Sequence, residues 1–301
     1  MLDFSNSKIL IVGDVMLDKY YFGKVDRISP EAPVPIVNIQ KEESRLGGAS
    51  NVANNIVSLG GHSLLCGVIG HDLFGKEIER ISRHKNIDTF LLKTSSPTIT
   101  KARIIGGKQQ IVRVDYEDKS ELNADNKKLF RDTISRILPE YDILVISDYG
   151  KGLISEDLCR YLIKLAHKYD KKVIIDPKGK NWEKYSGADI VTPNVKELSD
   201  IVGYTVPNTD RAIEKAAREA ITNNHLTALL VTRSDKGMSL IGPIPPIHIP
   251  THSEEVFDVS GAGDTVVATL GLCLAAGFEI SEAMRTANIA AGIVVKKVGT
   301  A

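Results

Sequence analysis

The chain has 301 residues, of which 43% are apolar and 25% are charged, a composition typical of soluble globular proteins. Its 38 Lys and Arg residues equal its 38 Asp and Glu residues, and a net charge of zero argues against a protein that coats nucleic acid. No basic, apolar leader opens the sequence, and the longest uncharged apolar stretch (265–278) is too short to span a bilayer. Three scattered cysteines fit a reducing compartment. We therefore expect a cytoplasmic protein without a membrane partner.

The first part of the chain predicts a core strand followed by a small lid. "KILIV" (8–12) is typical of a buried strand, and "GDVMLD" follows it with acids at Asp14 and Asp18. "VPIVNI" (34–39) predicts another strand. Apolar and polar residues alternate in "TITKARII" and "QIVRVDY" on either side of "GGKQ", which indicates a half-exposed hairpin. We expect a small antiparallel β lid from about residues 15–40 and 90–115.

The second part of the chain alternates strands and helices. Short apolar runs occur at "DILVIS" (142–147), "KVIID" (172–176), "DIVT" (189–192) and "ALLVT" (228–232). Helical segments such as "EDLCRYLIKLAHKY" and "DRAIEKAAREAITN" lie between them. This alternation predicts a mostly parallel sheet with helices on both faces. We therefore expect residues 1–301 to form a single α/β domain that carries the lid.

Parallel sheets of this kind bind ligands at the carboxyl ends of their strands. Polar residues that directly follow a predicted strand are therefore candidates for a site. They are Asp14, Asp148, Asp176, Asn194 and Thr232. Each could equally be a turn residue or a helix cap.

"DVSGAGDT" (258–265) stands before an apolar helical stretch. Gly261, Ala262 and Gly263 let the backbone approach a ligand closely, and the unpaired amides of the helix start favour an anion such as phosphate. Asp264 beside that anion fits a general base that takes a proton from an attacking hydroxyl. For an isolated "GAGD", a first-turn acid favoured by the helix dipole is the alternative. The motif lacks the third glycine of a dinucleotide site and no Walker motif occurs, which disfavours a dehydrogenase or a P-loop enzyme.

A second glycine cluster extends this interpretation to a family. "GGASNVANNIVSLG" (47–60) and "DVSGAGDT" resemble the two signature motifs of the ribokinase-like, or PfkB, carbohydrate kinases. "TPNVKEL" (192–198) resembles the NxxE element of that family, and "VTRSDKGM" (231–238) resembles its strand–turn–strand beside the ATP phosphates. The resemblance implies a ribokinase-like α/β fold and a kinase that uses ATP and Mg²⁺. A sugar sensor without activity is disfavoured because the acid of "GAGD" is intact.

Within this family, a closer resemblance is to the kinases of D-glycero-β-D-manno-heptose 7-phosphate. It rests on "VGDVMLDKYYFGKVDRISPEAPVPIV", "SDYGKG", "IDPKG" and "TRSDKGMSL". It implies phosphorylation of O1 to the 1,7-bisphosphate, in ADP-heptose synthesis for the lipopolysaccharide core. Another sugar, sugar-phosphate or nucleoside kinase of the family is the alternative. The expected partners are a second copy of the chain and a fused or separate nucleotidyltransferase domain.

The resemblance also implies roles for single residues on the nucleotide side. The general base and its anion hole would be formed by Asp264, Gly261, Ala262 and Gly263. Asn194 and Glu197 would position Mg²⁺ through water, and the same pair would also suit a helix-capping box. Further nucleotide contacts would come from Thr232, Arg233, Gly237 and Asn288. A monovalent cation such as K⁺ would lie at Asp258 and Ser260.

The sugar side would use carboxylates, which accept two hydroxyl donors at once, and glycines, which leave room for the ring. The implied residues are Asp14, Asp18, Asp148, Gly47, Gly48 and Asn51. The substrate's own phosphate has five candidate cations, each of which could equally be a solvated surface residue. They are Arg27, Lys101, Arg103, Arg113 and Lys151.

Overall fold

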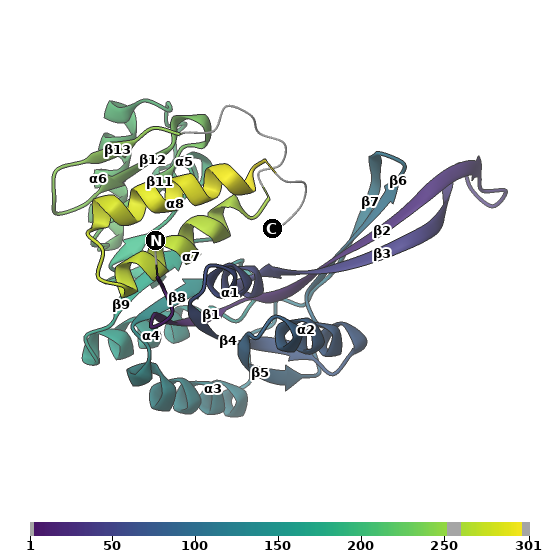
Figure 1. Cartoon of the computed structure of the whole chain (residues 1–301), viewed down its shortest axis with the longest axis horizontal. Helices are drawn as coiled ribbons and strands as arrows, with labels where there is room; N and C mark the ends of the chain where they lie inside the picture. The colour runs from purple at the N-terminus through teal and green to yellow at the C-terminus, as the bar shows by residue number, and fades with distance from the viewer. Residues whose placement is uncertain (1–2, 252–259, 297–301) are drawn as a thin grey trace.

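The computed structural model describes residues 3–251 and 260–296, which form two β-sheets, the larger of them covered by helices (Figure 1). The nine-stranded sheet has the order β13-β12-β11-β10-β9-β8-β1-β4-β5, and the four-stranded sheet has the order β3-β2-β6-β7. In this described part of the chain, no helix combines the length and the apolar character needed to cross a membrane.

The large sheet is parallel from β5 to β11, and antiparallel pairing adds β12 and β13 at its edge. Strand β8 is buried along its whole length, which explains why "ILVIS" has no polar face until its last residue. The strands of this sheet are β1 (Lys8–Gly13), β4 (His62–Gly70), β5 (Asp88–Thr94), β8 (Ile143–Ser147), β9 (Lys172–Asp176), β10 (Ile190–Val191), β11 (Leu229–Thr232), β12 (Met238–Ile241) and β13 (Ile247–Ile249).

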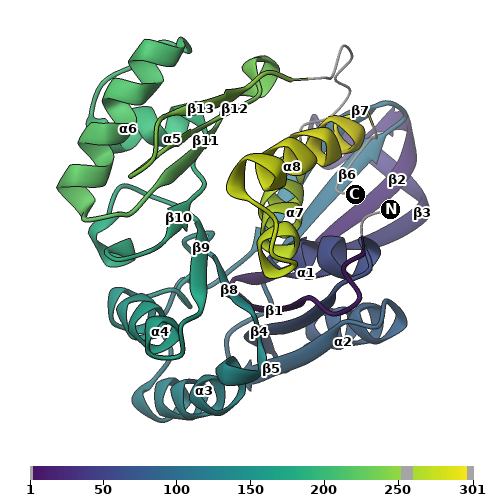
Figure 2. The same ribbon diagram turned by 60° about the vertical axis from the view of Figure 1, so that its left-hand side comes forward.

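Helices cover both faces of the large sheet (Figure 2). One face packs against α1 (Ala49–Ser58), α2 (Leu73–His84), α7 (Ala262–Ala275) and α8 (Ile280–Val294). The other face packs against α3 (Ala124–Ile137), α4 (Glu156–Lys168), α5 (Val195–Val202) and α6 (Asp210–Asn224).

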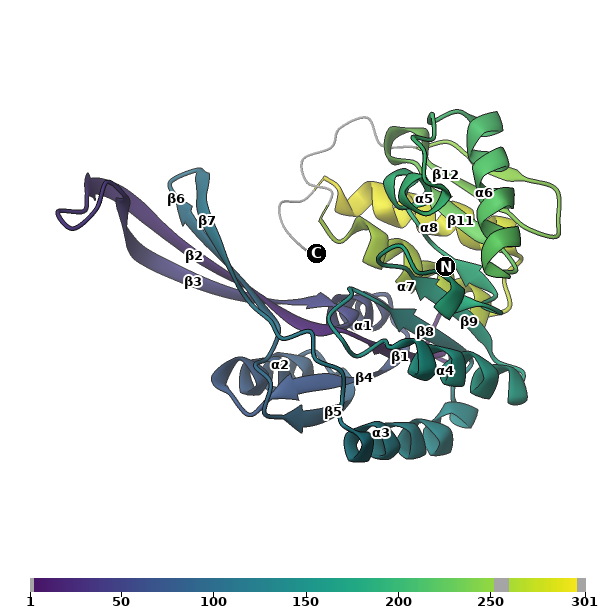
Figure 3. The ribbon, with the colours of Figure 1, turned by 180° about the vertical axis from the view of Figure 1, so that it is seen from behind.

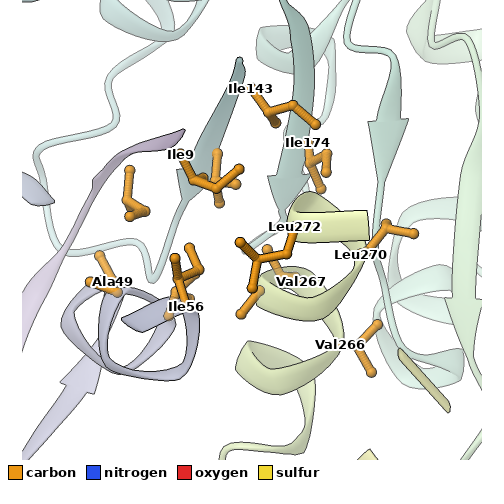
Figure 4. Packing of buried hydrophobic residues seen from close by; sticks show 14 of the residues in the cluster. Ile9, Ala49, Ile56, Ile143, Ile174, Val266, Val267, Leu270 and Leu272 are labelled. Carbon is orange, nitrogen blue, oxygen red and sulfur yellow. The ribbon is translucent and has the colours of Figure 1, made fainter. Parts of the chain in front are cut away.

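Two buried clusters hold these layers together, and β1 contributes to both. Ile9 and Ile11 belong to the cluster under α1 and α7, whereas Leu10 and Val12 belong to the cluster under α3 and α4. This alternation follows from the two-residue period of a strand. Figure 4 shows the first cluster, in which Leu272 of α7 lies among strand residues and α1.

The small sheet consists of two antiparallel hairpins that project away from the large sheet (Figure 3). Strands β2 (Val15–Ile28) and β3 (Pro35–Gly48) form the first hairpin, and β6 (Thr100–Gly106) and β7 (Gln109–Tyr116) form the second. Strands β2 and β6 join the hairpins by parallel pairing, with Leu17 opposite Thr100.

The predicted fold class is confirmed, with three differences in the lid. Its first segment runs to Gly48 and not to about residue 40, because β3 continues to the start of α1. Its central pairing is parallel, although the lid was expected to be antiparallel. The second lid segment also begins later than expected, because residues 88–94 form β5 at the edge of the large sheet. In β5, Leu91 packs on one core cluster while Phe90 and Leu92 pack on the other, so this strand lies between two layers of the core.

Candidate active site

The carboxyl ends of several strands meet the start of α7 at one pocket. Asp176 ends β9, Thr232 ends β11, and Asn194 precedes α5; all three line the pocket together with Asp264 of α7. Four carboxylates lie along this pocket, from Asp148, Asp176, Glu197 and Asp264, and Lys178 is the one Lys or Arg among the described residues that line it. Such a concentration of acids suits a site for metal-bound phosphates better than one for free anions.

Asp264 lies in the first turn of α7 and is 4% exposed. Its two carboxylate oxygens have different donors: Nδ2 of Asn51 lies 2.7 Å from Oδ2, and the hydroxyl of Tyr149 lies 2.9 Å from Oδ1. Burial raises the pKa of Asp264 to about 6, while the hydrogen bonds from Asn51 and Tyr149 act in the opposite direction. A carboxyl with this pKa is ionised at neutral pH and can still accept a proton, as a general base requires.

The backbone before Asp264 leaves the start of α7 open. Gly261 adopts a left-handed conformation (φ 81°) as the N-cap of the helix, which a glycine does without strain. A Cβ added at Gly263 would meet no atom of the described residues within 4 Å, so these residues leave the space above this turn open for a ligand. The amides of a helix's first turn have no intrahelical acceptor and can therefore bind an anion there.

Gly47 and Gly48 allow close contacts within the protein, and neither borders open space. A Cβ on Gly47 would lie 2.4 Å from Oδ2 of Asp18, and one on Gly48 would lie 2.6 Å from the backbone oxygen of Asp14. Gly48 also has a left-handed backbone (φ 56°) directly before α1. These glycines therefore place Asp18 and α1 close together, next to Asn51.

The predicted Asn194–Glu197 pair forms a complete capping box. Oδ1 of Asn194 accepts from the Glu197 amide (2.9 Å), and Oε2 of Glu197 accepts from the Asn194 amide (3.1 Å). The remaining Oε1 of Glu197 pairs with Nζ of Lys178 at 3.0 Å. Asp176, which is half-buried in the same pocket, has its pKa raised well above the usual range by burial and by the charges of Asp264 and Glu197.

The geometry does not support a phosphate contact by the side chain of Arg233. Its side chain is 4% exposed and lies inside the protein, where the guanidinium donates to Asn208 (2.9 Å), Ser239 (2.8 Å) and Asp210 (2.5 Å). The residue joins the loop before α6 to β12. Arg233 does follow a strand, as predicted, but two of its partners, Asn208 and Asp210, lie more than twenty residues earlier in the chain.

Three other predicted ligand residues also have structural partners. Asn288 donates to the backbone oxygen of Pro250 (2.7 Å) and so ties α8 to the end of β13. Gly237 has φ 81°, and a Cβ there would lie 2.0 Å from the backbone oxygen of Ile249, which explains the glycine by a tight turn. Asp148 accepts from Lys184 and from the hydroxyl of Tyr185 (2.7 Å) through Oδ2.

Asp14 is buried beneath the loop that follows β8. Its Oδ2 accepts from the amides of Tyr149 (2.8 Å) and Lys151 (3.1 Å), while its Oδ1 has no hydrogen-bond partner in the described part of the chain. Burial and the charge of Asp148 raise the pKa of Asp14 to about 6. The contacts of Oδ2 therefore fix the loop from 149 to 151. A direct hydrogen bond from a sugar hydroxyl would have to go to Oδ1 of Asp14.

The structure separates the five candidate phosphate-binding cations. Lys101 and Arg103 lie on β6 near Asp18, and Nη1 of Arg103 is 2.6 Å from Oδ1 of Asp18. The other candidates are placed as follows: Lys151 pairs with Glu117, Arg113 pairs with Asp115 on an exposed strand, and Arg27 is exposed near the outer end of β2.

Lys101 is the candidate with the most unusual surroundings. Its ammonium lies 5.5 Å from the centre of the Tyr149 ring, and no hydrogen-bonded or ion-paired partner is found for it among the described residues. Burial lowers the pKa of Lys101, the charge of Asp18 acts in the opposite direction, and the positive charges of Lys151 and Arg103 lower it further. A half-buried, unpaired ammonium beside other cations is a suitable place for an added anion.

Sequence reasoning did not single out Tyr149 or Lys178 and named Asp176 only as a strand end. The motifs "SDYGKG" and "IDPKG" contained all three residues, but their side-chain directions depend on the tertiary structure. Of the predicted monovalent-cation residues, Asp258 lies outside the described residues, so that site stays a prediction.

Comparison with known proteins identifies the family. The model of the pfkB family carbohydrate kinases matches residues 6–301. The chain is 46% identical over 300 residues to the Bifunctional protein HldE of Haemophilus influenzae (strain PittEE), which covers 99% of this chain and 62% of that protein. It is 44% identical over 296 residues to the protein of the same name from Paramagnetospirillum magneticum, covering 97% of this chain and 60% of the relative. The chain thus spans less than two thirds of the length of these two relatives.

Solved structures agree on the fold. Phosphofructokinase-2 from Escherichia coli in complex with potassium superposes with a TM-score of 0.80 at 21% identity, covering 98% of this chain and 94% of that one. Ribokinase from Arabidopsis thaliana complexed with ribose and ATP gives a TM-score of 0.75 at 20% identity, covering 97% and 94% of the two chains. With its pocket at the start of α7 and a family match over nearly its whole length, the chain belongs to the pfkB family of carbohydrate kinases.

Proposed function

We propose that this kinase transfers the terminal phosphoryl group of ATP to O1 of D-glycero-β-D-manno-heptose 7-phosphate, a step of ADP-heptose synthesis for the lipopolysaccharide core. The observation that carries the catalytic part is the buried Asp264 at the open start of α7, held by Asn51 and Tyr149. The choice of sugar is supported by the motif resemblance and by the identity to the HldE proteins over nearly the whole chain.

In the proposed reaction, one oxygen of Asp264 accepts the proton of the sugar hydroxyl as that hydroxyl oxygen attacks the phosphorus. The new O–P bond forms while the bond from the terminal phosphorus to the bridging oxygen of ATP breaks, and ADP leaves. The amides of the first turn of α7, next to Gly261 and Gly263, would hold the transferring group. In this reaction the phosphoryl group passes directly from ATP to the sugar, with no covalent intermediate on the protein.

Kinases of this family use ATP with a divalent metal, and we propose Mg²⁺. Asp176 and Glu197 offer carboxylate oxygens on the same pocket, which fits a cation that takes one or two carboxylates and keeps several waters. When bound, Mg²⁺ would neutralise part of the phosphate charge. Asn194 supports this arrangement indirectly, because its amide oxygen is used to cap α5 and to orient Glu197.

Lys178 is proposed as the cation that meets the nucleotide phosphates. Its ammonium pairs with Glu197 at 3.0 Å, yet its side chain is 52% exposed and lies at the pocket. A phosphate placed at the start of α7 would offer Lys178 a more strongly charged partner than a single carboxylate.

Two lid cations support a phosphorylated sugar rather than a free one. Lys101 and Arg103 lie beside Asp18 on the lid, where a sugar held at Asp264 would extend. A second phosphate on the substrate would supply the anion that the Lys101 ammonium lacks.

We propose the remaining partners on separate grounds. Apolar side chains such as Ile28 (62% exposed) and Val112 (45% exposed) lie on the small sheet, which supports a homodimer formed through the lid. The relatives are named bifunctional, which supports a nucleotidyltransferase domain fused to the kinase or acting beside it. A potassium ion in the structure of phosphofructokinase-2 supports a monovalent-cation site near Ser260.

The substrate is tested by measuring ATP consumption with a panel of acceptors. Heptose 7-phosphate should give the highest kcat/KM among heptose 7-phosphate, free heptose, fructose 6-phosphate, ribose and a nucleoside. A higher kcat/KM with fructose 6-phosphate, ribose or the nucleoside would make this chain another sugar kinase of the family.

Glu197→Gln should raise the Mg²⁺ concentration at half-maximal rate by roughly 10–100-fold, the usual effect of disturbing a residue that supports a metal site. The amide keeps the acceptor of the capping box but removes the charge that attracts the cation. The measurement is a Mg²⁺ titration of the rate at saturating ATP and sugar, with the KM of the sugar as an internal reference.

The matched control is Asp200→Asn, which removes an exposed acid from the same helix, away from the pocket. It should leave the titration unchanged. If the Glu197→Gln titration overlays that of the parent, Glu197 serves only to cap α5.

A further inference from the structure

Tyr149 connects three parts of the candidate site. It follows β8 by two residues, and its amide donates to Oδ2 of Asp14 at 2.8 Å. Its hydroxyl donates to Oδ1 of Asp264 at 2.9 Å, and its ring lies 5.5 Å from the ammonium of Lys101 on the lid. A single side chain therefore contacts the proposed base and the lid, while its backbone is fixed by a buried acid.

The hydrogen bond to Asp264 has a defined direction. An ionised carboxylate only accepts, so the Tyr149 hydroxyl must be the donor. Burial and the neighbouring charge of Asp264 raise the pKa of Tyr149 well above its usual range, so the hydroxyl keeps its proton at neutral pH. Nδ2 of Asn51 in α1 donates to the other oxygen of Asp264, so each carboxylate oxygen is held by a donor from a different part of the fold.

We propose that Tyr149 is a positioning residue for Asp264, a role that rests on the proposed function. The Tyr149 hydroxyl fixes the orientation of the Asp264 carboxylate and favours its charged form. The contact of Lys101 with the Tyr149 ring connects this hydrogen bond to the lid.

Charged side chains that face Asp264 also shift its pKa, beside the hydrogen bond from Tyr149. Asp18 from β2 disfavours the charged form of Asp264, and Lys101 from β6 favours it. Asp176 from β9 and Asp264 repel each other, and the charge of Asp264 raises the pKa of Asp176. Because Asp264 is buried, it has few groups to stabilise its charge, and Tyr149 and Asn51 are the two hydrogen-bond donors found for it among the described residues. Loss of the Tyr149 hydroxyl should therefore raise the pKa of Asp264.

The test is the pH dependence of kcat/KM for Tyr149→Phe, at fixed saturating MgATP. The ring and the backbone amide remain, so the contacts to Lys101 and Asp14 are kept. We expect the acid limb of the profile to move up by about one to two pH units, the size expected from one hydrogen bond to a charged group. The rate should consequently fall by roughly tenfold near pH 6 and recover above pH 9.

Two control variants show whether the shift comes from the lost hydrogen bond to Asp264. Tyr169→Phe, at the C-cap of α4 and away from the pocket, should leave the profile unchanged. Lys101→Met should move the acid limb in the same direction as Tyr149→Phe, because Lys101 also favours the charged form of Asp264.

An acid limb that stays in place for Tyr149→Phe overturns the proposal, and so does a loss that is equal at every pH. Asp264→Asn in the same assay distinguishes this failure from that of the proposed function. If Asp264→Asn keeps full activity, Asp264 is not the base at all; if it loses activity while Tyr149→Phe keeps the parent profile, only the role of Tyr149 is wrong.

Discussion

Asp264→Asn should lower kcat by roughly 10²–10⁴-fold, the usual contribution of a positioned general base. The amide has the same shape but cannot take the proton of the sugar hydroxyl. The pocket should tolerate it. Oδ1 of Asn51 is buried and has no hydrogen-bond partner among the residues that the structure describes, so it can accept from the new amide once Asn51 turns. The measurement is the steady-state rate at saturating ATP and sugar, with ATP affinity from calorimetry as the check on folding.

The matched control is Asp125→Asn, which removes an exposed acid from the first turn of α3, outside the pocket. Because Asp125 is exposed, this variant should keep its kcat. Turnover of Asp264→Asn within a few-fold of the parent would remove Asp264 from the mechanism.

The pH profile gives a second readout of the same residue. Burial raises the pKa of Asp264 to about 6, and a general base acts only in its ionised form. The rate should therefore fall as the pH drops through about 6 and be flat above it. Asp14 also has a pKa raised to about 6, so either acid could cause this fall. The pH profile of the residual activity of Asp264→Asn decides between the two acids: the acid limb is lost from this profile if Asp264 is the titrating base.

Features that are local in the sequence could be predicted from it. The start of α7 at "GAGD" and the helix after Asn194 follow from patterns within a few residues, and the structure has both. The hairpin of β6 and β7 is equally local, since its strands are separated by a two-residue turn. In each of these cases the residues that determine the structure are neighbours in the chain.

Features that depend on distant residues could not be predicted in the same way. Arg233 and Lys101 are both cations on or after strands, yet Arg233 is enclosed by Asn208 and Asp210, more than twenty residues earlier, whereas Lys101 has no such partner among the residues that the structure describes. The parallel pairing of β2 with β6 joins segments separated by β3, α1, β4, α2 and β5. The difference between a structural cation and an available one is thus a property of the packing and not of the local sequence.

Lys101→Met should lower kcat/KM by about 10- to 150-fold with a phosphorylated sugar, since a charge-assisted hydrogen bond contributes about 1.5–3 kcal/mol. Met keeps most of the length of the side chain and its contact with the ring of Tyr149, but it removes the charge. Arg103 is a less clean probe because its loss would also leave Asp18 unpaired. The measurement compares heptose 7-phosphate with free heptose, both assayed at pH 9, where Asp264 is fully ionised.

The comparison at pH 9 separates two roles that Lys101 could have. If Lys101 binds the remote phosphate, the loss is large with heptose 7-phosphate and nearly absent with free heptose, because only the phosphorylated sugar carries that anion. If Lys101 acts only through Asp264, the variant recovers with both sugars at this pH, and the phosphate must then be bound by another cation such as Lys151. Lys108→Met is the matched control: Lys108 lies in the exposed turn between β6 and β7, and its loss should change neither value. Equal losses with the two sugars at pH 9 would contradict the phosphate role, because a contact to that phosphate cannot affect a sugar that lacks it.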